Sequence, residues 1–128
     1  MLSLLIALSM GKKENLKGLI DDGADLIIAD IRDEAEIDKL TKQAEVVFHL
    51  ACLGVRHSMN NPLENHDVNA TATLKLLNAS RRNHVRKFIY VCSSDVYGTA
   101  GWVQVSEQHP TLPNTVYGDS QNGDRVKS

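Results

Sequence analysis

Polar side chains that can do chemistry follow three apolar runs of the chain at the point where each run ends. Asp30 closes one of these runs, Cys52 follows the next, and Ser93 follows the third. A carboxylate, a thiol and a hydroxyl at such positions can all form hydrogen bonds with a bound ligand. Ligands of parallel α/β sheets bind at the carboxyl ends of the strands. We therefore expect these three chain segments to form the candidate site.

The sequence gives no sign of metal or disulfide chemistry. Cys52 and Cys92 have neither CxxC nor Cys/His spacing, so we expect two buried, reduced thiols. His49 and His57 have no partner at the spacing of metal ligands. The sequence therefore predicts no metal site.

The composition is that of a globular domain and excludes several classes of function. The length of 128 residues allows one domain, and 14 Lys+Arg against 16 Asp+Glu give a net charge of -2. This balance argues against a nucleic-acid binder. The apolar opening, residues 1–10, is too short to span a bilayer and lacks the charged start of a signal peptide. We expect a cytoplasmic protein without nucleic-acid or membrane partners.

Apolar runs alternate with amphipathic stretches, which predicts strands alternating with helices. Strands are expected at residues 2–8, 25–30, 46–51 and 87–92. Helices are expected at residues 12–22, 33–43 and 62–84, and a loop over residues 93–116. Continuous apolar strands predict a doubly wound parallel sheet covered on both faces by helices. The ends of three adjacent strands would then converge on one crevice.

Six short segments occur in an order and spacing characteristic of one family. They are DIRD (30–33), HLAC (49–52), NATAT..LL (69–77), KFIYVCSSDVYG (87–98), E..P..P (107–113) and TVYGDS (115–120). Together they resemble the extended short-chain dehydrogenase/reductase family, in its nucleotide-sugar epimerase/dehydratase branch. LSMGKKENL (8–16) and GVRHS (54–58) are most similar to the UDP-glucose 4-epimerase group. The resemblance implies a Rossmann-like α/β fold, NAD as cofactor, and a nucleotide sugar, with a UDP-sugar favoured, as substrate.

The same resemblance implies which residues would contact NAD. Asp30 and Ile31 would meet the adenine, with the Asp30 carboxylate accepting from its amino group. Asn69 would lie in the middle of a helix near the active site and help to fix it. The residues expected along the path of the cofactor are Leu50, Ala51 and Cys52.

Two residues fall at the catalytic positions of the family. Tyr117 would take a proton from a sugar hydroxyl while hydride leaves the adjacent carbon for NAD, so it would lie against the cofactor as well. Ser93 would hydrogen-bond the same hydroxyl. Ser94 and Asp95 are second choices for substrate contact, and Tyr97 is expected to be structural.

The sequence departs from the family pattern in three places. Free tyrosine has a pKa of about 10, and the family lowers it with a lysine four residues on. That position holds the uncharged Gln121, and Arg125 and Lys127 are poor substitutes. None of the eight glycines forms the glycine-rich turn that holds the pyrophosphate. Against the family pattern, we therefore expect a partial domain that lacks the first βα unit and the C-terminal substrate lobe.

These departures leave three interpretations open. Residues 1–128 could be a partial NAD(P)-binding domain from a longer epimerase or dehydratase. They could also be a non-catalytic remnant that binds a nucleotide weakly or serves in assembly, or the product of a gene-model error. We expect the chain alone to be inactive and to show no measurable affinity for NAD. A homodimer would use the helix at 62–84.

Overall fold

The computed structural model describes residues 3–6, 12–99 and 105–123. The strands are β1 (Ser3–Ile6), β2 (Asp25–Ile28), β3 (Val46–His49) and β4 (Lys87–Tyr90). The helices are η1 (Lys13–Leu16), α1 (Lys17–Asp21), α2 (Glu34–Thr41), α3 (Val55–Asn60), α4 (Pro62–His66), the π-helical η2 (Asp67–Thr71), α5 (Ala72–Arg82), η3 (Ser94–Tyr97) and α6 (Val116–Gly123). Each of the four predicted strands is present. The segment predicted as loop contains η3, and the start of α6 lies at its end.

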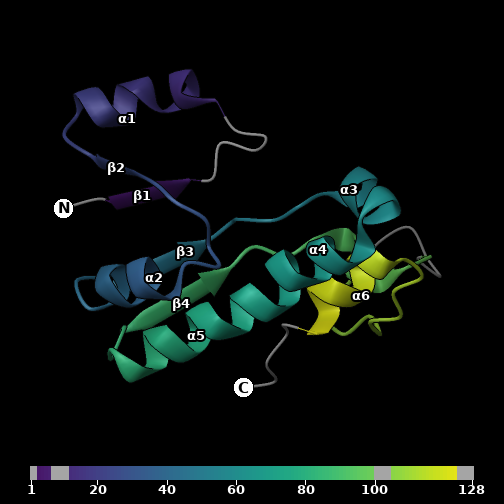
Figure 1. Ribbon diagram of the computed structural model, residues 1–128. Coiled ribbons are helices and arrows are strands. Elements are labelled where there is room, and N and C mark those ends of the chain that lie inside the picture. Colours follow the sequence, from purple (N-terminus) through teal and green to yellow (C-terminus); the bar gives the residue numbers. More distant parts are fainter. Residues whose placement is uncertain (1–2, 7–11, 100–104, 124–128) are drawn as a thin grey trace.

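The strands pair in parallel, which agrees with the predicted α/β class. β1 pairs with β2 from Ser3↔Asp25 onward, and β3 pairs with β4 from Val46↔Lys87 onward. These are two separate two-stranded sheets, and the β1–β2 pair lies apart from the β3–β4 pair in Figure 1. The prediction of three adjacent strands is wrong in one respect, because no hydrogen-bonded ladder joins β2 to β3 in the described part of the chain.

The main core lies between α2, α5 and one face of the β3–β4 sheet. Val47 and Phe88 pack from the sheet against a cluster of buried apolar side chains. The members of that cluster are Ile31, Ile37, Val68, Ala72, Leu76 and Ala79. The periodic apolar positions predicted for the long helix account for Val68, Ala72 and Leu76, since residues three and four apart share one helix face.

Local interactions fix α2 against α5. Asp33 caps α2 by accepting from the backbone N–H groups of Ala35 and Glu36, both at 3.1 Å. On the other side, Asp38 accepts from Arg82 at 2.7 Å and from Asn83 at 3.0 Å.

None of the described helices is long and apolar enough to cross a membrane.

The second face of the β3–β4 sheet carries apolar side chains that no described helix covers. Alternate residues of a strand point to opposite faces, so the neighbours of Val47 and Phe88 point away from the core. We call this surface the outer face; it consists of Val46, Phe48, Leu50, Ile89 and Val91. Phe48 is 64%, Leu50 63% and Val91 53% exposed. Among the described residues, the buried cluster lies against the Val47 and Phe88 face of this strand pair.

Candidate active site

Three predicted site residues meet where β3, β4 and α6 come together. Tyr117 lies in the first turn of α6 and is buried. Its phenol donates to the Sγ atom of Cys52, which follows β3, at 4.0 Å. The Ser93 side chain, after β4, lies close enough to the phenol to lower its pKa. The structure therefore brings Tyr117, Ser93 and Cys52 into one constellation.

Two glycines allow this approach of the chain segments. A Cβ atom on Gly118 would lie 2.6 Å from the carbonyl oxygen of Asp95, so only glycine lets α6 pack this closely on η3. Gly98 has φ 62° and ends η3, and a Cβ there would overlap the carbonyl oxygen of Leu112. Ser93 begins η3 by accepting from the Asp95 N–H at 3.2 Å, which fixes the direction of its hydroxyl.

The environment of Tyr117 favours the neutral phenol. Burial is the main cause that raises its pKa, and the negative charges of Cys52 and Asp95, when ionised, act in the same direction. The nearby Ser93 side chain lowers the pKa and offsets part of this shift. At neutral pH Tyr117 is therefore a hydrogen-bond donor rather than a base.

Gln121, one helical turn after Tyr117, is turned toward another partner. Its side chain is 2% exposed, and its Oε1 accepts from the Tyr90 hydroxyl at 2.8 Å. Its Nε2 is buried and has no hydrogen-bond partner among the described residues. A neutral amide gives the phenolate no charge stabilisation. Arg125 and Lys127, the substitutes considered above, lie outside the described residues.

A pair of buried asparagines holds the loop that carries Cys52. Asn69 accepts from the Leu53 N–H at 2.7 Å and donates to the Leu53 carbonyl at 2.8 Å. Asn65 donates to the same carbonyl at 2.8 Å and accepts from Asn69 at 3.1 Å. We call this group the asparagine clamp: Asn65, Asn69 and the backbone of Leu53. Asn69 was predicted to fix the site, and its observed contacts are with the backbone of this loop.

Sequence reasoning missed Asn65 and the π-helical turn η2 that contains Asn69. Asn65 is 0% and Asn69 1% exposed. The available signal was the spacing of four between two asparagines in a predicted helix, which places them on one face. π-Helical turns occur mostly as local bulges and often at functional sites.

The residues after β3 lie at the surface. Leu50, Ala51 and Cys52, which were predicted to line the path of the cofactor, are all exposed. Cys52 and Cys92 are exposed, so the prediction of buried thiols is wrong. The reason is their position just beyond the strands, where the chain leaves the covered part of the sheet.

The predicted adenine end of the site is held by ion pairs. The Asp30 carboxylate accepts from Arg32 Nη2 at 2.7 Å and from Arg32 Nε at 3.0 Å. This hydrogen bonding is the main cause that lowers the pKa of Asp30. Arg32 also reaches Glu64 at 3.5 Å and Asp67 at 3.7 Å, which links Asp30 to α4 and η2. The side chain of Ile31 is buried in the core.

The described residues fit the two ends of a dinucleotide better than its middle. Asp30 stands at one end, and Ser93 and Tyr117 stand at the other. The middle of a dinucleotide is its diphosphate, which is held by a glycine-rich turn between a strand and a helix. Gly54 lies before α3, but α3 has only six residues. No other described glycine lies between a strand and the start of a helix. No described segment therefore forms a glycine-rich diphosphate turn, and we derive no step that passes through NAD.

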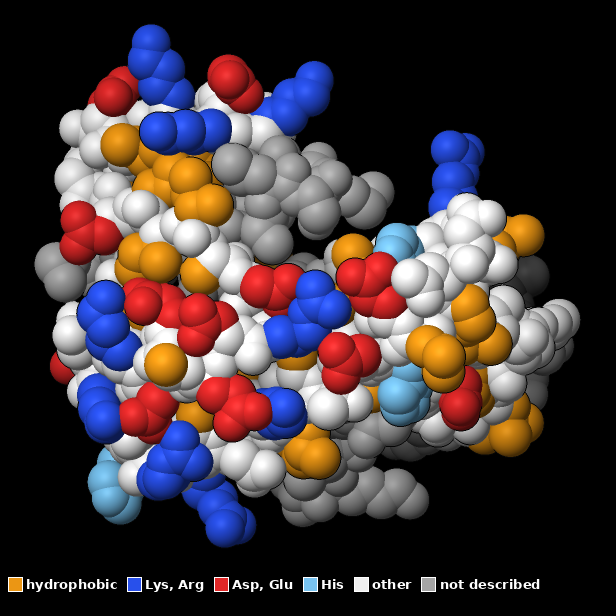
Figure 2. All heavy atoms as spheres, in the orientation of Figure 1, with side chains coloured by type: hydrophobic (Ala, Val, Ile, Leu, Met, Phe, Trp, Pro, Cys, Tyr) orange, Lys and Arg blue, Asp and Glu red, His pale blue; other side chains and the backbone are white. Residues whose placement is uncertain are grey.

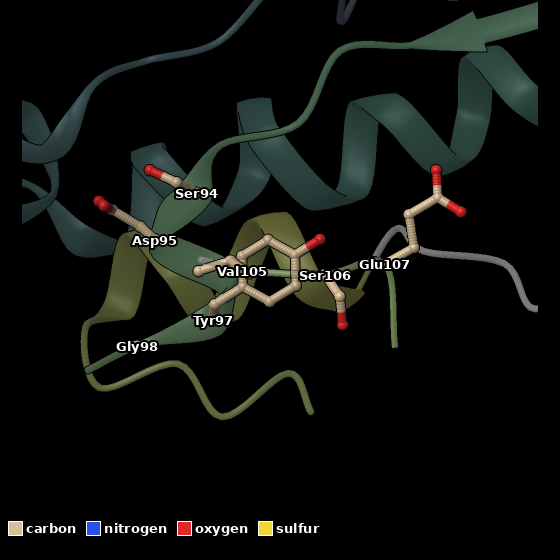
Figure 3. A pocket seen from close by; sticks show the side chains of 7 residues that line it. All are labelled: Ser94, Asp95, Tyr97, Gly98, Val105, Ser106 and Glu107. Carbon is tan, nitrogen blue, oxygen red and sulfur yellow. The ribbon is translucent and has the colours of Figure 1, made fainter. Parts of the chain in front are cut away.

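A shallow pocket lies beside the constellation. Its volume is about 370 Å³, and its lining residues are Ser94, Asp95, Tyr97, Gly98, Val105, Ser106 and Glu107. In Figure 3 the Tyr97 ring lies between Ser94 and Asp95 on one side and Glu107 on the other. Ser94 and Asp95, the second choices for substrate contact, therefore border an open space. In the described segments, no three His, Cys, Asp or Glu side chains are grouped to hold a metal ion.

Parallel strands joined by helices, with a serine and a tyrosine meeting beyond the strand ends, define a Rossmann-like α/β protein. Residues 6–124 match the family model described as GDP-mannose 4,6 dehydratase. The chain belongs to the extended short-chain dehydrogenase/reductase family, in its nucleotide-sugar epimerase/dehydratase branch. The predicted family is thus confirmed.

Individual relatives agree with this assignment. UDP-glucose 4-epimerase of Mycolicibacterium smegmatis is 36% identical over 115 residues, which are 86% of this chain and 36% of that protein. dTDP-glucose 4,6-dehydratase of an Actinoplanes species is 31% identical over 119 residues, or 89% of this chain and 37% of that protein. The chain therefore spans little more than a third of the length of these relatives.

A solved structure shows the same fold. UDP-glucose-4-epimerase from Stenotrophomonas maltophila, with bound NAD and formylated UDP-arabinopyranose, is 26% identical and has a TM-score of 0.84. The similarity covers 93% of this chain and 37% of that chain.

Proposed function

We propose that the chain carries the Ser/Tyr part of an NAD-dependent nucleotide-sugar epimerase or dehydratase of the UDP-glucose 4-epimerase type. The observation that supports this most directly is the meeting of Tyr117 and Ser93 beyond the ends of β3 and β4. The family match and the relatives named for UDP-glucose and dTDP-glucose add a nucleotide sugar as the substrate class. The proposal takes NAD as the cofactor on the same grounds, since the similar epimerase structure from Stenotrophomonas maltophila contains bound NAD.

In this proposal the two hydroxyl groups act on one sugar hydroxyl. Tyr117 accepts its proton only as the phenolate, which needs a nearby positive charge that Gln121 does not supply, and Ser93 hydrogen-bonds the same oxygen and keeps it oriented toward the phenol. Both positions are fixed before a sugar binds, because Ser93 begins η3 and Gly118 sets α6 against η3. Such preorganisation lowers the entropic cost of the reacting geometry.

We further propose that these 128 residues alone are inactive. The observation that favours this is the pKa of Tyr117, which burial raises, together with the neutral Gln121 one turn away. A general base works best when its pKa is near the working pH. The chain then binds no NAD measurably, because the described residues lack a diphosphate turn.

Isothermal titration calorimetry tests the second proposal. We expect no heat of binding when NAD is titrated into the chain, and no turnover of UDP-glucose. Gln121→Lys alone should restore neither, since the lysine supplies charge but no diphosphate site. Micromolar NAD affinity, or turnover in either protein, would contradict the proposal.

A chimera tests the first proposal. Residues 6–124 would replace the matching segment of the Mycolicibacterium smegmatis epimerase, with Gln121→Lys included, and UDP-glucose epimerisation would be measured. We expect activity that falls by at least ~10²-fold with Tyr117→Phe, the loss typical of removing an acid–base group. Tyr97→Phe is the matched control and should retain activity. A folded, NAD-binding chimera with no Tyr117-dependent turnover would refute this role.

A further inference from the structure

We infer that Thr73 and His49 are positioning residues of the Ser/Tyr site: their buried hydrogen bonds hold the turn of helix that contains Asn69, and through Asn69 they hold the loop of Cys52. Neither residue is a member of the constellation itself. The catalytic meaning of this inference rests on the proposed function, but the contacts that support it lie within the described residues and can be tested without turnover.

The Thr73 hydroxyl lies between two partners. Its Oγ1 atom donates to the Asn69 carbonyl at 2.7 Å and lies 2.7 Å from His49 Nε2. A hydroxyl has one proton to donate. Because the Asn69 carbonyl engages that proton, His49 must donate from Nε2 to the Thr73 oxygen. We call this chain of hydrogen bonds the threonine relay: His49, Thr73 and Asn69.

The relay defines the protonation of the His49 ring. Burial lowers the pKa of His49 to about 4, so the ring is neutral near neutral pH. A neutral imidazole carries one proton, on one of its two nitrogens. Since Nε2 donates to Thr73, the proton is on Nε2 and Nδ1 carries none.

The geometry of the helix explains why Asn69 needs this support. Asn69 lies in the π-helical turn η2, where the Ala72 N–H bonds to the Asp67 carbonyl five residues back. Such turns are rare and occur as local bulges within α-helices. A threonine hydroxyl that bonds to the carbonyl four residues earlier often bends a helix. The Thr73 hydroxyl therefore fixes the backbone at the residue that leaves the regular α-helical pattern.

The Asn69 side chain connects this turn to the site. Its amide accepts from the Leu53 N–H at 2.7 Å and donates to the Leu53 carbonyl at 2.8 Å. It thus holds both backbone groups of the residue that follows Cys52. The Cys52 Sγ atom accepts from the Tyr117 phenol at 4.0 Å. A shift of η2 therefore moves Cys52 relative to Tyr117.

Burial makes the relay a firm connection. His49 and Thr73 are each 3% exposed, and the His49 ring stacks on Tyr90 with the centroids 5.3 Å apart. Loss of a hydrogen bond in such a place leaves a polar group without a partner and without water. Figure 2 shows acidic and basic side chains interspersed over α2 and α5. Ion pairs there, such as Lys75 with Glu34, are exposed and bind more weakly because water competes for both partners.

Nitrogen NMR of the wild-type chain near neutral pH tests the first step of the relay. We expect His49 Nε2 to show the shift of a protonated ring nitrogen and Nδ1 that of an unprotonated one. The opposite pattern would overturn the inference, because Thr73 would then donate to His49 and not to Asn69.

Amide hydrogen exchange tests the second step. Thr73→Val keeps the shape of the side chain and removes the hydroxyl. The Leu53 amide should then exchange at least about tenfold faster, while amides in the middle of α5 change less, because the loop opens locally. Thr73→Ser restores the hydroxyl and should exchange like the wild type. Equal acceleration throughout the chain would show a general loss of stability and overturn the inference.

Thr41→Val is the matched control for this experiment. Thr41 is also buried, and its hydroxyl also donates to the carbonyl four residues earlier, that of Ile37, at 2.8 Å. It belongs to α2, outside the relay, so Thr41→Val should leave the Leu53 amide unchanged. If circular dichroism shows that Thr73→Val folds poorly, His49→Phe removes only the donor to Thr73 and should accelerate Leu53 exchange by a smaller factor. Unchanged exchange in His49→Phe would count against the relay.

Ultraviolet titration, with Tyr117→Phe subtracted, tests the last step. Cys52 contributes to the raised pKa of Tyr117, so this pKa should move toward the ordinary value of tyrosine in Thr73→Val and stay as in the wild type in Thr73→Ser. A Tyr117 pKa that is the same in Thr73→Val and in the wild type would overturn the link to the site.

The chimera described above separates this inference from the proposed function. In an active chimera, Thr73→Val should lower kcat at least about tenfold with KM nearly unchanged, and Thr73→Ser should retain activity. Full kcat in Thr73→Val would overturn the positioning role. An inactive chimera would refute the proposed function alone, because exchange and titration are measured without substrate and still decide the relay.

Discussion

The two ends of the candidate site are held by different kinds of interaction. The Asp30 end depends on ion pairs of Arg32 between partly exposed side chains. The Tyr117 end depends on neutral hydrogen bonds in the interior, with the asparagine clamp behind Cys52. Exposed ion pairs contribute little because water competes for both partners, whereas a buried polar group that loses its partner is costly. The Tyr117 end is therefore rigid, and the Asp30 end is easily rearranged.

Removing the clamp should have the largest effect. Asn69→Leu leaves the Leu53 N–H and the Asn65 amide oxygen buried without partners, and should lower the free energy of unfolding by about 3–4 kcal/mol. Urea denaturation measures this loss. Asn83→Ala is the matched control, because Asn83 makes three hydrogen bonds to α2 in a part-buried place and should cost about 1 kcal/mol. Equal losses in the two variants would show that the deeper burial of Asn69 does not increase the cost of removing its hydrogen bonds.

Acid should weaken the Tyr117 end through His49. Burial lowers the pKa of His49 from 6.5 to about 4, and its Nε2 lies 2.7 Å from Thr73 Oγ1, which in turn donates to the Asn69 carbonyl. Between those two pKa values the unfolded chain binds more protons than the folded chain. Stability is therefore full above pH 6.5 and falls as the pH drops toward 4, by roughly 2–3 kcal/mol in total.

Denaturation midpoints measured across this range check the effect of His49. His49→Phe keeps the stacking position next to Tyr90 and removes the titrating group. This variant should show a flatter pH dependence between 6.5 and 4. A variant with an unchanged slope would mean that another group is responsible.

Gly118→Ala should loosen the constellation itself. The added methyl group would meet the Asp95 carbonyl at 2.6 Å, so α6 must shift, at a cost of about 1–3 kcal/mol. Because burial is the main cause of the raised pKa of Tyr117, that pKa should move back toward 10. Ultraviolet titration, with Tyr117→Phe subtracted to assign the signal, measures it. Gly18→Ala is the control, since a Cβ atom on Gly18 meets open space.

Arg32→Gln should have the smallest effect on stability. Loss of its exposed ion pairs should cost at most about 0.5–1 kcal/mol, and less in high salt. The pKa of Asp30 should rise toward its ordinary value, as followed by carboxyl NMR shifts. Lys75→Gln removes another exposed ion pair and should leave Asp30 unchanged. A loss of several kcal/mol in Arg32→Gln would show that the two ends are equally firm.

Local pattern was sufficient to predict the elements but not their mutual arrangement. Asp25–Ile28 and Lys87–Tyr90 form strands because apolar runs of this length, rich in isoleucine, phenylalanine and tyrosine, fit a pleated ladder. The exposure of Phe48 could not be predicted, since it depends on which helices reach the second face. Asn65 was missed because the sequence of a helix does not show whether a polar residue is buried. The burial of Asn65 depends on its partner, the backbone of Leu53, which comes from another segment of the chain.

The sequence by itself determined the family, the parallel α/β class and the candidate residues Ser93 and Tyr117, because these follow from apolar periodicity and from motifs of fixed spacing. It also determined that Gln121 carries no charge. Only the tertiary structure decided that the phenol lies against Cys52, that Asp30 is engaged by Arg32, and that Asn65 and Asn69 are buried. The physical reason is that burial and hydrogen-bond partners arise between segments far apart in the chain, where spacing along the sequence carries no information.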